Sequence, residues 1–508
     1  MKIKHILSAM LLSALPLWDA VAQWNTTKTP FTIVDCEGKN EYYAVTPHFA
    51  RTTDGKTWMA YKVWTSEGVS TYVQLLDQDG KLVFDGPLGI RLNSYPTNTW
   101  WSEYGLDIAS DGSALVTVAD ARNTEPIEGL YYAFVPTIYK ISQSGEFLWG
   151  ADGISFPDYI SGSLTNVYVN GDDVYFQFNC TSADERGTYT CRIDPNGTVA
   201  VGPKSLAGQM IASEGSDMLA FSSSGEGSTV QRYNRDLEPV WDAPIVYDTL
   251  SYSGHDLRPY KIVSDGEGGA AVAFVCAMGS DGHNIRAQYV TADGDLGFGL
   301  VGKYLYNYME YDHNYCGIAL NPTTKEILVD WQDKLDRYTV SVGKLNYGGD
   351  YLWGETGIQI DEKASTEVLQ FSRVGYGSLS CGDWMVAYSN MLEWEKSALI
   401  VKRLSASGSV MWEKAVGRSF GINDPTMIVE EDYTYIFWRD DVKNALYGLR
   451  IVNEDGTYTA IDGTPIDTSN SSQGEAIYSI GGQRLSTPQK GLNIIRQANG
   501  EIIKKSIH

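Results

Sequence analysis

The sequence predicts an all-β fold: an eight-bladed β-propeller followed by a small C-terminal β-segment. A turn recurs eight times, and its clearest copies, GEFLWGADGISF from Gly145 and GDYLWGETGIQI from Gly349, share a G-x-x-L-W-G-x-x-G-I pattern. The first and last copies, at Gly80 and Gly456, lie seven intervals apart, which makes the repeat about 54 residues long. A period near 50 residues with strand-like content is typical of a propeller. Seven blades are the alternative count.

Each repeat is predicted to contain three or four antiparallel strands joined by hairpin turns. A run rich in β-branched and aromatic residues precedes each turn, as in TYVQLLD from Thr71 and ALIVKRL from Ala398. One strand earlier lies a more apolar run, such as SALVTVAD from Ser113, which follows an Asp-Gly or similar hairpin signal. Arranging such sheets around an axis buries both faces of each sheet. The predicted blades begin near residues 47, 105, 163, 207, 259, 316, 371 and 425.

The two ends of the chain differ from the repeats. Residues 1–22 combine an early positive charge, an apolar stretch and a small-x-small exit, so we expect a signal peptide cleaved after Ala22. Residues 23–462 form the expected propeller, and FTIVD from Phe31 is a candidate outer strand of the last blade, closing the ring. The polar stretch 463–475 is typical of a flexible linker. The mature chain has no other apolar run near 18 residues, so we expect no membrane span.

Residues 476–508 contain short strand-like runs separated by Gly-Gly and Asn-Gly turns. The segment resembles the C-terminal sorting domain of cargo carried by the type IX secretion system of some Gram-negative bacteria. The resemblance rests on Ile477-Tyr478, Gly481-Gly482, Gly491 to Ile495, and Lys504-Lys505. It implies that secretion machinery is a partner and that the protein is secreted or held on the outer cell surface, with the periplasm as the alternative.

The blades themselves resemble a family of secreted bacterial propellers with a D-G-x-G-G-x-x-x-A-W-x-D repeat. Asp265 to Gly269 match the first half of that repeat, and Trp331 to Asp333 and Trp438 to Asp440 match the second. The resemblance implies a fold rather than an activity, because propellers host many unrelated functions.

Composition limits the partners. The formal net charge is −24, which disfavours binding to the phosphate backbone of nucleic acid. Six cysteines in an exported chain are able to form disulfides. Cys180 and Cys191 flank a loop between adjacent strands and are the expected disulfide pair; buried thiols are the alternative for the others.

The sequence carries no strong catalytic signature, and we expect neither catalytic residues nor a cofactor. TTDGKTW from Thr52 resembles the Asp-box of sialidase propellers but is one residue short, so we interpret it as a hairpin turn. Asp120, Asp333 and Asp440 recur where the second strand of a blade ends. Recurrence once per repeat favours a structural role over carboxylates gathered at the channel mouth.

The loops between blades are the predicted binding surface. Three of them, NSYPTNTWWSEYG, LSYSGHDLRPY and NYMEYDHNY, combine aromatic with polar residues, the mixture that suits a sugar or an extended peptide. Loops on rigid scaffolds often carry function, although single aromatics also fill gaps between blades. The candidate ligand-binding residues are Trp100, Trp101, Tyr104, Tyr252, Asp256, Arg258, Tyr308, Tyr311 and Asp312.

His48, His255 and His313 also fall in blade-entry loops. With neighbouring aspartates they are weak candidates for metal ligands, and solvent-facing loop histidines are the alternative.

These features favour a binding propeller that engages a glycan or a protein through its aromatic loops without turnover. Two alternatives remain: an exo-acting glycoside hydrolase with carboxylates at the channel mouth, and a structural or adhesive surface module.

Overall fold

The computed structural model is built of β-strands, and its described residues contain no helix. They divide into two compact units, Met1–Gly456 and Thr457–His508. The described residues are 31–35, 44–86, 88–92, 95–97, 104–122, 134–160, 165–181, 186–206, 208–224, 227–248, 258–277, 283–306, 316–334, 338–360, 374–393, 396–419, 422–440, 444–457, 476–479, 484–485, 491–496 and 502–507. The predicted signal peptide (1–22) and linker (463–475) lie outside them.

The first unit is an eight-bladed β-propeller, as predicted. It contains eight four-stranded sheets, and seven of these are consecutive antiparallel meanders. Blades 1 to 4 are β2 (Ala44–Arg51), β3 (Thr57–Thr65), β4 (Gly68–Leu76) and β5 (Ile90–Arg91); β6 (Gly105–Ile108), β7 (Ala114–Asp120), β8 (Val135–Ile141) and β9 (Ile154–Ser155); β10 (Thr165–Asn170), β11 (Asp173–Cys180), β12 (Gly187–Ile193) and β13 (Val199–Ser205); and β14 (Gln209–Ala212), β15 (Met218–Ser224), β16 (Gly227–Tyr233) and β17 (Ile245–Asp248). Blades 5 to 7 are β18 (Arg258–Ser264), β19 (Ala270–Ala277), β20 (His283–Val290) and β21 (Lys303–Tyr306); β22 (Cys316–Asn321), β23 (Glu326–Lys334), β24 (Tyr338–Asn346) and β25 (Ile358–Gln359); and β26 (Gly375–Ser378), β27 (Trp384–Glu393), β28 (Lys396–Leu404) and β29 (Val410–Ser419).

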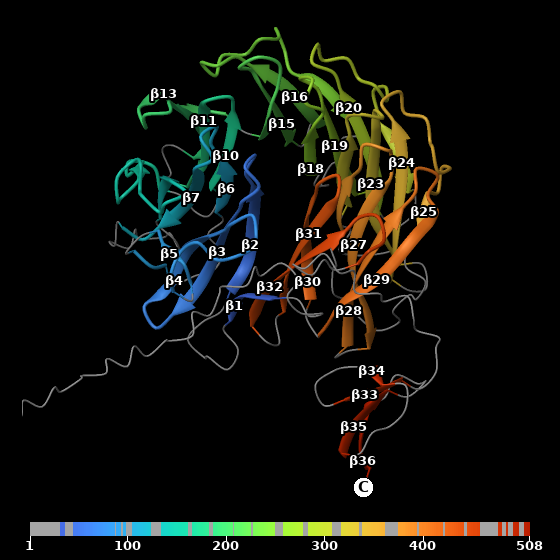
Figure 1. Ribbon diagram of the computed structural model, residues 1–508. Helices are drawn as coiled ribbons and strands as arrows, with labels where there is room; N and C mark the ends of the chain where they lie inside the picture. Colours follow the sequence, from blue (N-terminus) through green and yellow to red (C-terminus); the bar gives the residue numbers. More distant parts are fainter. Residues whose placement is uncertain are drawn as a thin grey trace, which may run out of the picture. The chain divides into compact units, whose positions relative to one another are not determined.

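The eighth blade closes the ring with a strand from the other end of the chain. β30 (Ile422–Val429), β31 (Tyr433–Asp440) and β32 (Ala445–Val452) are joined by β1 (Phe31–Asp35), which pairs antiparallel with β32. In Figure 1, β1 (blue) lies beside β32 (red). The predicted outer strand FTIVD is therefore confirmed.

The first strand of each blade contacts the first strand of the next around the whole ring, so these eight strands surround the axis. The hydrophobic core lies between neighbouring blades. One cluster joins Ala271 and Ile285 of blade 5 with Ile327 and Trp331 of blade 6, all nearly inaccessible to solvent. Each blade therefore buries both faces, which explains why the second strands are almost continuously apolar.

The recurrent turn has a packing role between blades. Gly197 lies between the third and fourth strands of blade 3 with a φ of 86°, and a Cβ there would lie 2.7 Å from Trp149 Cδ1 of blade 2. Gly408 of blade 7 contacts Trp353 of blade 6 in the same way. In both copies the glycine receives the tryptophan ring of the preceding blade, and Trp412, in the same motif as Gly408, packs in turn on Gly456 of blade 8. This arrangement explains why both residues recur together.

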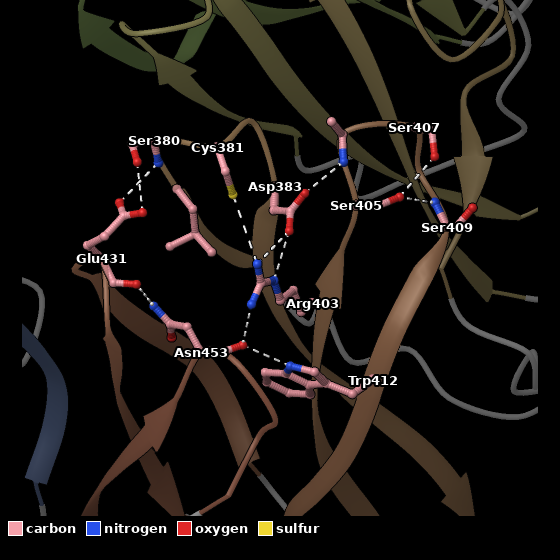
Figure 2. Close-up of polar contacts among 12 residues, drawn as sticks. Ser380, Cys381, Asp383, Arg403, Ser405, Ser407, Ser409, Trp412, Glu431 and Asn453 are labelled. Carbon is pink, nitrogen blue, oxygen red and sulfur yellow. Dashed lines mark hydrogen bonds and ion pairs between the residues drawn. The ribbon is translucent and has the colours of Figure 1, made fainter.

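Hydrogen bonds reinforce the same contact, as Figure 2 shows between blades 7 and 8. Arg403 pairs with Asp383 of its own blade at 2.7 Å and donates through Nη1 to the Asn453 carbonyl oxygen of blade 8 at 2.9 Å. Trp412 Nε1 donates to the same oxygen at 2.9 Å. Blade 6 repeats the pattern, since Lys344 and Trp353 both donate to the Ala406 carbonyl oxygen. Neighbouring blades are thus held by charge-assisted bonds in addition to apolar packing.

The expected Cys180–Cys191 disulfide is wrong. In the β11–β12 hairpin Cys180 lies opposite Gly187, whereas Cys191 lies opposite Phe176, four residues along the strand. That offset is about 13 Å at the rise of a strand, well beyond the reach of a disulfide. Cys191 is a buried free thiol, and burial raises its pKa to about 12. The two cysteines flank the same loop, but the register keeps them apart.

The second unit is a small four-stranded sheet with the order β34-β33-β35-β36. Its strands are β33 (Ala476–Ser479), β34 (Arg484–Leu485), β35 (Gly491–Arg496) and β36 (Ile502–Ile507). Across the described parts of both units, the structure contains no helix with the length and apolar character that crossing a membrane requires.

Candidate functional site

Most of the predicted ligand-binding residues lie outside the described residues. Among the predicted site residues, the structure describes the side chains of Tyr104 and His48, and Arg258 only as the first residue of β18, paired with Val275. The other predicted residues are outside this set: Trp100, Trp101, Tyr252, His255, Asp256, Tyr308, Tyr311, Asp312 and His313.

Tyr104 anchors the first aromatic loop where it enters blade 2. Only 7% of the residue is exposed, and its hydroxyl donates to the Ala60 carbonyl oxygen of blade 1 at 3.3 Å. The ring of His48 meets the Tyr104 ring edge-on, with 4.6 Å between centroids. Burial raises the pKa of Tyr104 well above its usual range. Tyr104, a candidate ligand-binding residue by sequence, is therefore packed and hydrogen-bonded against blade 1, directly after the loop that carries Trp100 and Trp101.

Two cations lie near Tyr104. Lys62 of β3 places Nζ 5.2 Å from the centre of the Tyr104 ring, a cation–π distance. The charge of Arg439, on β31, acts against the burial effect and favours the ionised form of Tyr104. Lys62 and Arg439 occupy the same register position in blades 1 and 8, which are neighbours across the closure of the ring. The described surroundings of Tyr104 are thus cationic and aromatic.

A second cluster joins blades 5, 6 and 7. Gly317 and Asp330 pair across β22 and β23 of blade 6. Both the Tyr376 hydroxyl of blade 7 and Asp330 Oδ1 lie within 2.5 Å of the point that a Cβ at Gly317 would occupy. Lys261 of blade 5 places Nζ 5.0 Å from the centre of the Tyr376 ring. The missing side chain at position 317 therefore creates the space in which these polar groups meet.

Burial controls the electrostatics of this second cluster. Asp330 is 3% exposed, and burial raises the pKa of its carboxyl to about 7, although Tyr376 and Lys261 both act in the opposite direction. Burial also raises the pKa of Tyr376 well above its usual range. Asp330 Oδ1 and the Tyr376 hydroxyl are close but have no aligned hydrogen-bond partner among the described residues. A carboxyl that titrates near neutral pH and a phenol are groups capable of proton transfer, although both are closed off from solvent.

Sequence reasoning missed this cluster, although one signal was present. In EILVDW the aspartate interrupts a run of apolar residues at a position that Ala273 and Ala387 occupy in the adjacent blades. A single acid at an apolar register position is unusual because burying an ionised carboxylate is costly. The contribution of Tyr376 required the packing of blade 7 against blade 6, which the sequence alone does not reveal.

The described carboxylate at a second-strand end has a structural role. Asp120 accepts two hydrogen bonds from the Arg122 side chain, each at 2.8 Å, and one from the Arg122 backbone N–H at 3.2 Å. Arg122 Nη2 also donates to the Tyr139 hydroxyl at 2.8 Å. TTDGKTW is a hairpin turn, in which Gly55 N donates to the Thr52 carbonyl oxygen at 3.0 Å. These contacts agree with the structural interpretation of Asp120 and with the hairpin interpretation of TTDGKTW, whereas the side chains of Asp333 and Asp440 lie outside the described set. No group of three or more candidate metal ligands occurs in the described part of the chain, which includes His48.

Comparison with known proteins gives no family assignment. No protein-family model matches the chain, and no curated protein matches its sequence. Among solved structures, it is similar to polysaccharide lyase Uly1 (TM-score 0.41, 10% identity, 84% of this chain and 98% of that one). It is also similar to a protein of unknown function from Dyadobacter fermentans (0.37, 11%, 82% and 96%). A third is the NanB sialidase of Streptococcus pneumoniae (0.35, 9%, 84% and 70%). Similarity at this level carries no inference about activity.

Proposed function

We propose that this protein is a secreted or surface-displayed binding propeller that engages a glycan or a protein segment through its inter-blade loops, without turnover. The observation that carries the proposal is the anchoring of Tyr104. The loop with Trp100 and Trp101 ends on a residue that is packed and hydrogen-bonded to blade 1. A loop whose end is fixed loses less conformational freedom when a ligand binds, and aromatic side chains supply broad contact surfaces.

The loop proposal is tested with the double variant Trp100→Ala/Trp101→Ala on glycan arrays and in pull-downs. Met411→Ala is the matched control, because it shortens an apolar side chain that is 53% exposed on the outer strand of blade 7. The double variant is expected to lose binding while the control retains it. Unchanged binding by the double variant would remove the first aromatic loop from the proposal.

Turnover is tested separately with chromogenic glycosides. A glycoside hydrolase needs two carboxyl groups about 5–5.5 Å apart for retention or about 6.5–9.5 Å apart for inversion. We expect no release of the chromophore. Hydrolysis that is abolished by removing one acidic residue near the loops would favour the glycoside hydrolase alternative.

The route out of the cell rests on the two ends of the chain. We infer that residues 1–22 direct export and that residues 476–508 address the protein to type IX machinery, consistent with a secreted propeller of the D-G-x-G-G repeat type. Deleting residues 476–508 in the native host is expected to leave the propeller in the periplasm. Normal surface or medium levels of the shortened chain would contradict the sorting role.

A further inference from the structure

Asp330 is an acidic residue in the contact between blades 6 and 7, at a position where the repeat does not require an acid. The equivalent positions of the neighbouring blades are Ala273 and Ala387. Asp330 pairs with Gly317 across β22 and β23 and is only 3% exposed. Burying an ionised carboxylate is costly unless donors surround it, so the residue weakens this contact whenever it is charged.

The polar atoms of the contact are poorly matched. Asp330 Oδ1 and the Tyr376 hydroxyl both reach the space that Gly317 leaves open, within 2.5 Å of the point that a Cβ there would occupy. Both atoms are buried, and neither has an aligned hydrogen-bond partner among the described residues. Buried groups without partners are rare in folded proteins, because each keeps the cost of leaving water. An arrangement in which water reaches both groups would recover hydrogen bonds that the closed contact lacks.

The titratable groups around Asp330 come from three elements. Tyr376 lies on β26 of blade 7, and Lys261, an exposed residue of β18 in blade 5, places Nζ 5.0 Å from the centre of the Tyr376 ring. Cys316 of β22 is buried in the cluster that joins blades 5 and 6, and the residue opposite Asp330 on β24 is the apolar Val342. Tyr376 therefore contacts both the buried acid and an exposed residue, so a movement of its ring is a short route for water to the carboxyl.

Two further ionisable residues of blade 7 lie in the same interface. The Tyr388 hydroxyl donates to the Ile360 carbonyl oxygen of blade 6 at 3.0 Å. Lys402 donates to the same oxygen at 2.5 Å and pairs with Glu413 at 2.7 Å. Tyr388 is thus a hydrogen-bonded tyrosine between the same two blades, which makes it a matched control for Tyr376.

We propose that Asp330 and Tyr376 form a pH-dependent contact between blades 6 and 7, which is closed while Asp330 carries its proton and opens locally to water when Asp330 loses it. Burial raises the pKa of Asp330 in the closed contact to about 7, whereas a carboxyl in water titrates near 3.9. Because the closed form has the higher pKa, its advantage is complete below about pH 4 and is lost as the pH rises through 7. The equilibrium for opening therefore increases by up to about tenfold per pH unit across that range and is constant above it.

Hydrogen exchange measured by mass spectrometry on the full chain tests this contact between pH 5 and 8. Wild type is compared with Asp330→Asn at each pH, so that the intrinsic pH dependence of amide exchange cancels in the ratio of their rates. For peptides that contain Gly317 or Tyr376, the ratio is expected to increase about tenfold or more between pH 5 and 7 and to level off above 7. Peptides from β11 of blade 3 are the reference and are expected to keep a constant ratio.

Two tyrosine variants test the contribution of the phenol. Tyr376→Phe keeps the ring and removes a hydroxyl that favours the ionised form of Asp330. In this variant the pH at which exchange levels off is therefore expected to be higher than in the wild type. Tyr388→Phe removes the other hydroxyl and is expected to leave that pH unchanged. An unchanged pH in Tyr376→Phe would overturn the role of Tyr376.

The outcomes separate local opening from a change in overall stability. A rise in exchange confined to blades 6 and 7 supports the inference. A ratio that does not change with pH for the Gly317 and Tyr376 peptides overturns it, and so does a ratio that rises equally in the β11 peptides, because the acid then affects only the whole propeller. Circular dichroism verifies the fold of each variant. If Asp330→Asn does not fold, the β11 peptides of the wild type supply the comparison, since intrinsic exchange depends on pH in the same way in every blade.

Discussion

Replacing Asp330 with asparagine removes a carboxyl that the folded protein holds in its neutral form up to about pH 7. Burial raises the pKa of Asp330 to about 7, whereas an aspartate in the unfolded chain titrates near 3.9. The difference of about three units corresponds to about 4 kcal/mol. Because the folded pKa is raised, this stabilising contribution is complete below about pH 4 and is lost as the pH rises through 7. Above pH 7 the wild type therefore buries a charge that Asp330→Asn does not carry.

The assay is urea unfolding of wild type and variant across pH 4 to 8.5. The two proteins are expected to have similar unfolding free energies near pH 4, and the variant is expected to be more stable by a few kcal/mol at pH 8. Other titrating groups cancel in the difference. Asp107→Asn is the companion variant, since burial raises the pKa of Asp107 to about 6. Its difference in unfolding free energy from the wild type should therefore stop growing at a pH about one unit lower than for Asp330→Asn. Parallel curves for wild type and Asp330→Asn would refute a neutral buried carboxyl.

Three further predictions concern the packing between blades. Gly197→Ala is expected to lower stability by about 1–3 kcal/mol more than Gly150→Ala in thermal unfolding; both glycines have a φ near 87°, but only a Cβ at Gly197 meets Trp149, at 2.7 Å. Equal losses would exclude the ring contact as the cause. Trp412→Phe is expected to cost about 1 kcal/mol in the same assay, because it removes the hydrogen bond to the Asn453 carbonyl oxygen, and an unchanged melting temperature would contradict that role. Mass spectrometry after alkylation of the denatured, unreduced protein is expected to find Cys191 alkylated. An unmodified Cys191 would show that its thiol is in a disulfide.

The repeat was visible in the sequence because the recurrent turn serves the repeat itself. Gly197 and Gly408 must accept an aromatic ring at positive φ, which explains why the glycine recurs in most copies; in DLEPVW, Leu237 takes its place with a φ of 57°. The closing strand was also predictable, because FTIVD is a strand-like run left outside the eight repeats. The Cys180–Cys191 prediction failed because proximity in sequence does not give register, and a hairpin places residues by its ladder.

The residues that distinguish one blade from another were harder to predict, because they break the repeat. Tyr104 is an aromatic loop residue by sequence, but its contacts with His48 and Ala60 make it an anchor. Knowing that required the position of blade 1 against the entry to blade 2, which depends on packing between segments distant from each other in sequence. Aromatic composition alone does not distinguish a side chain that binds a ligand from one that fills a gap between blades.

The function of a propeller therefore depends on residues that differ between equivalent positions of its blades. A residue that recurs in most blades, such as the turn glycine, stabilises contacts between blades and says little about a ligand. Lys261 has the glycines Gly317 and Gly375 at its position in the next two blades, and Asp330 has alanines at its position in the adjacent ones. Where the equivalent position of the neighbouring blades carries a small residue, the blade fold itself does not require a charged side chain. For that reason a binding site is expected among the residues that differ from blade to blade, rather than in the conspicuous G-x-x-L-W turn.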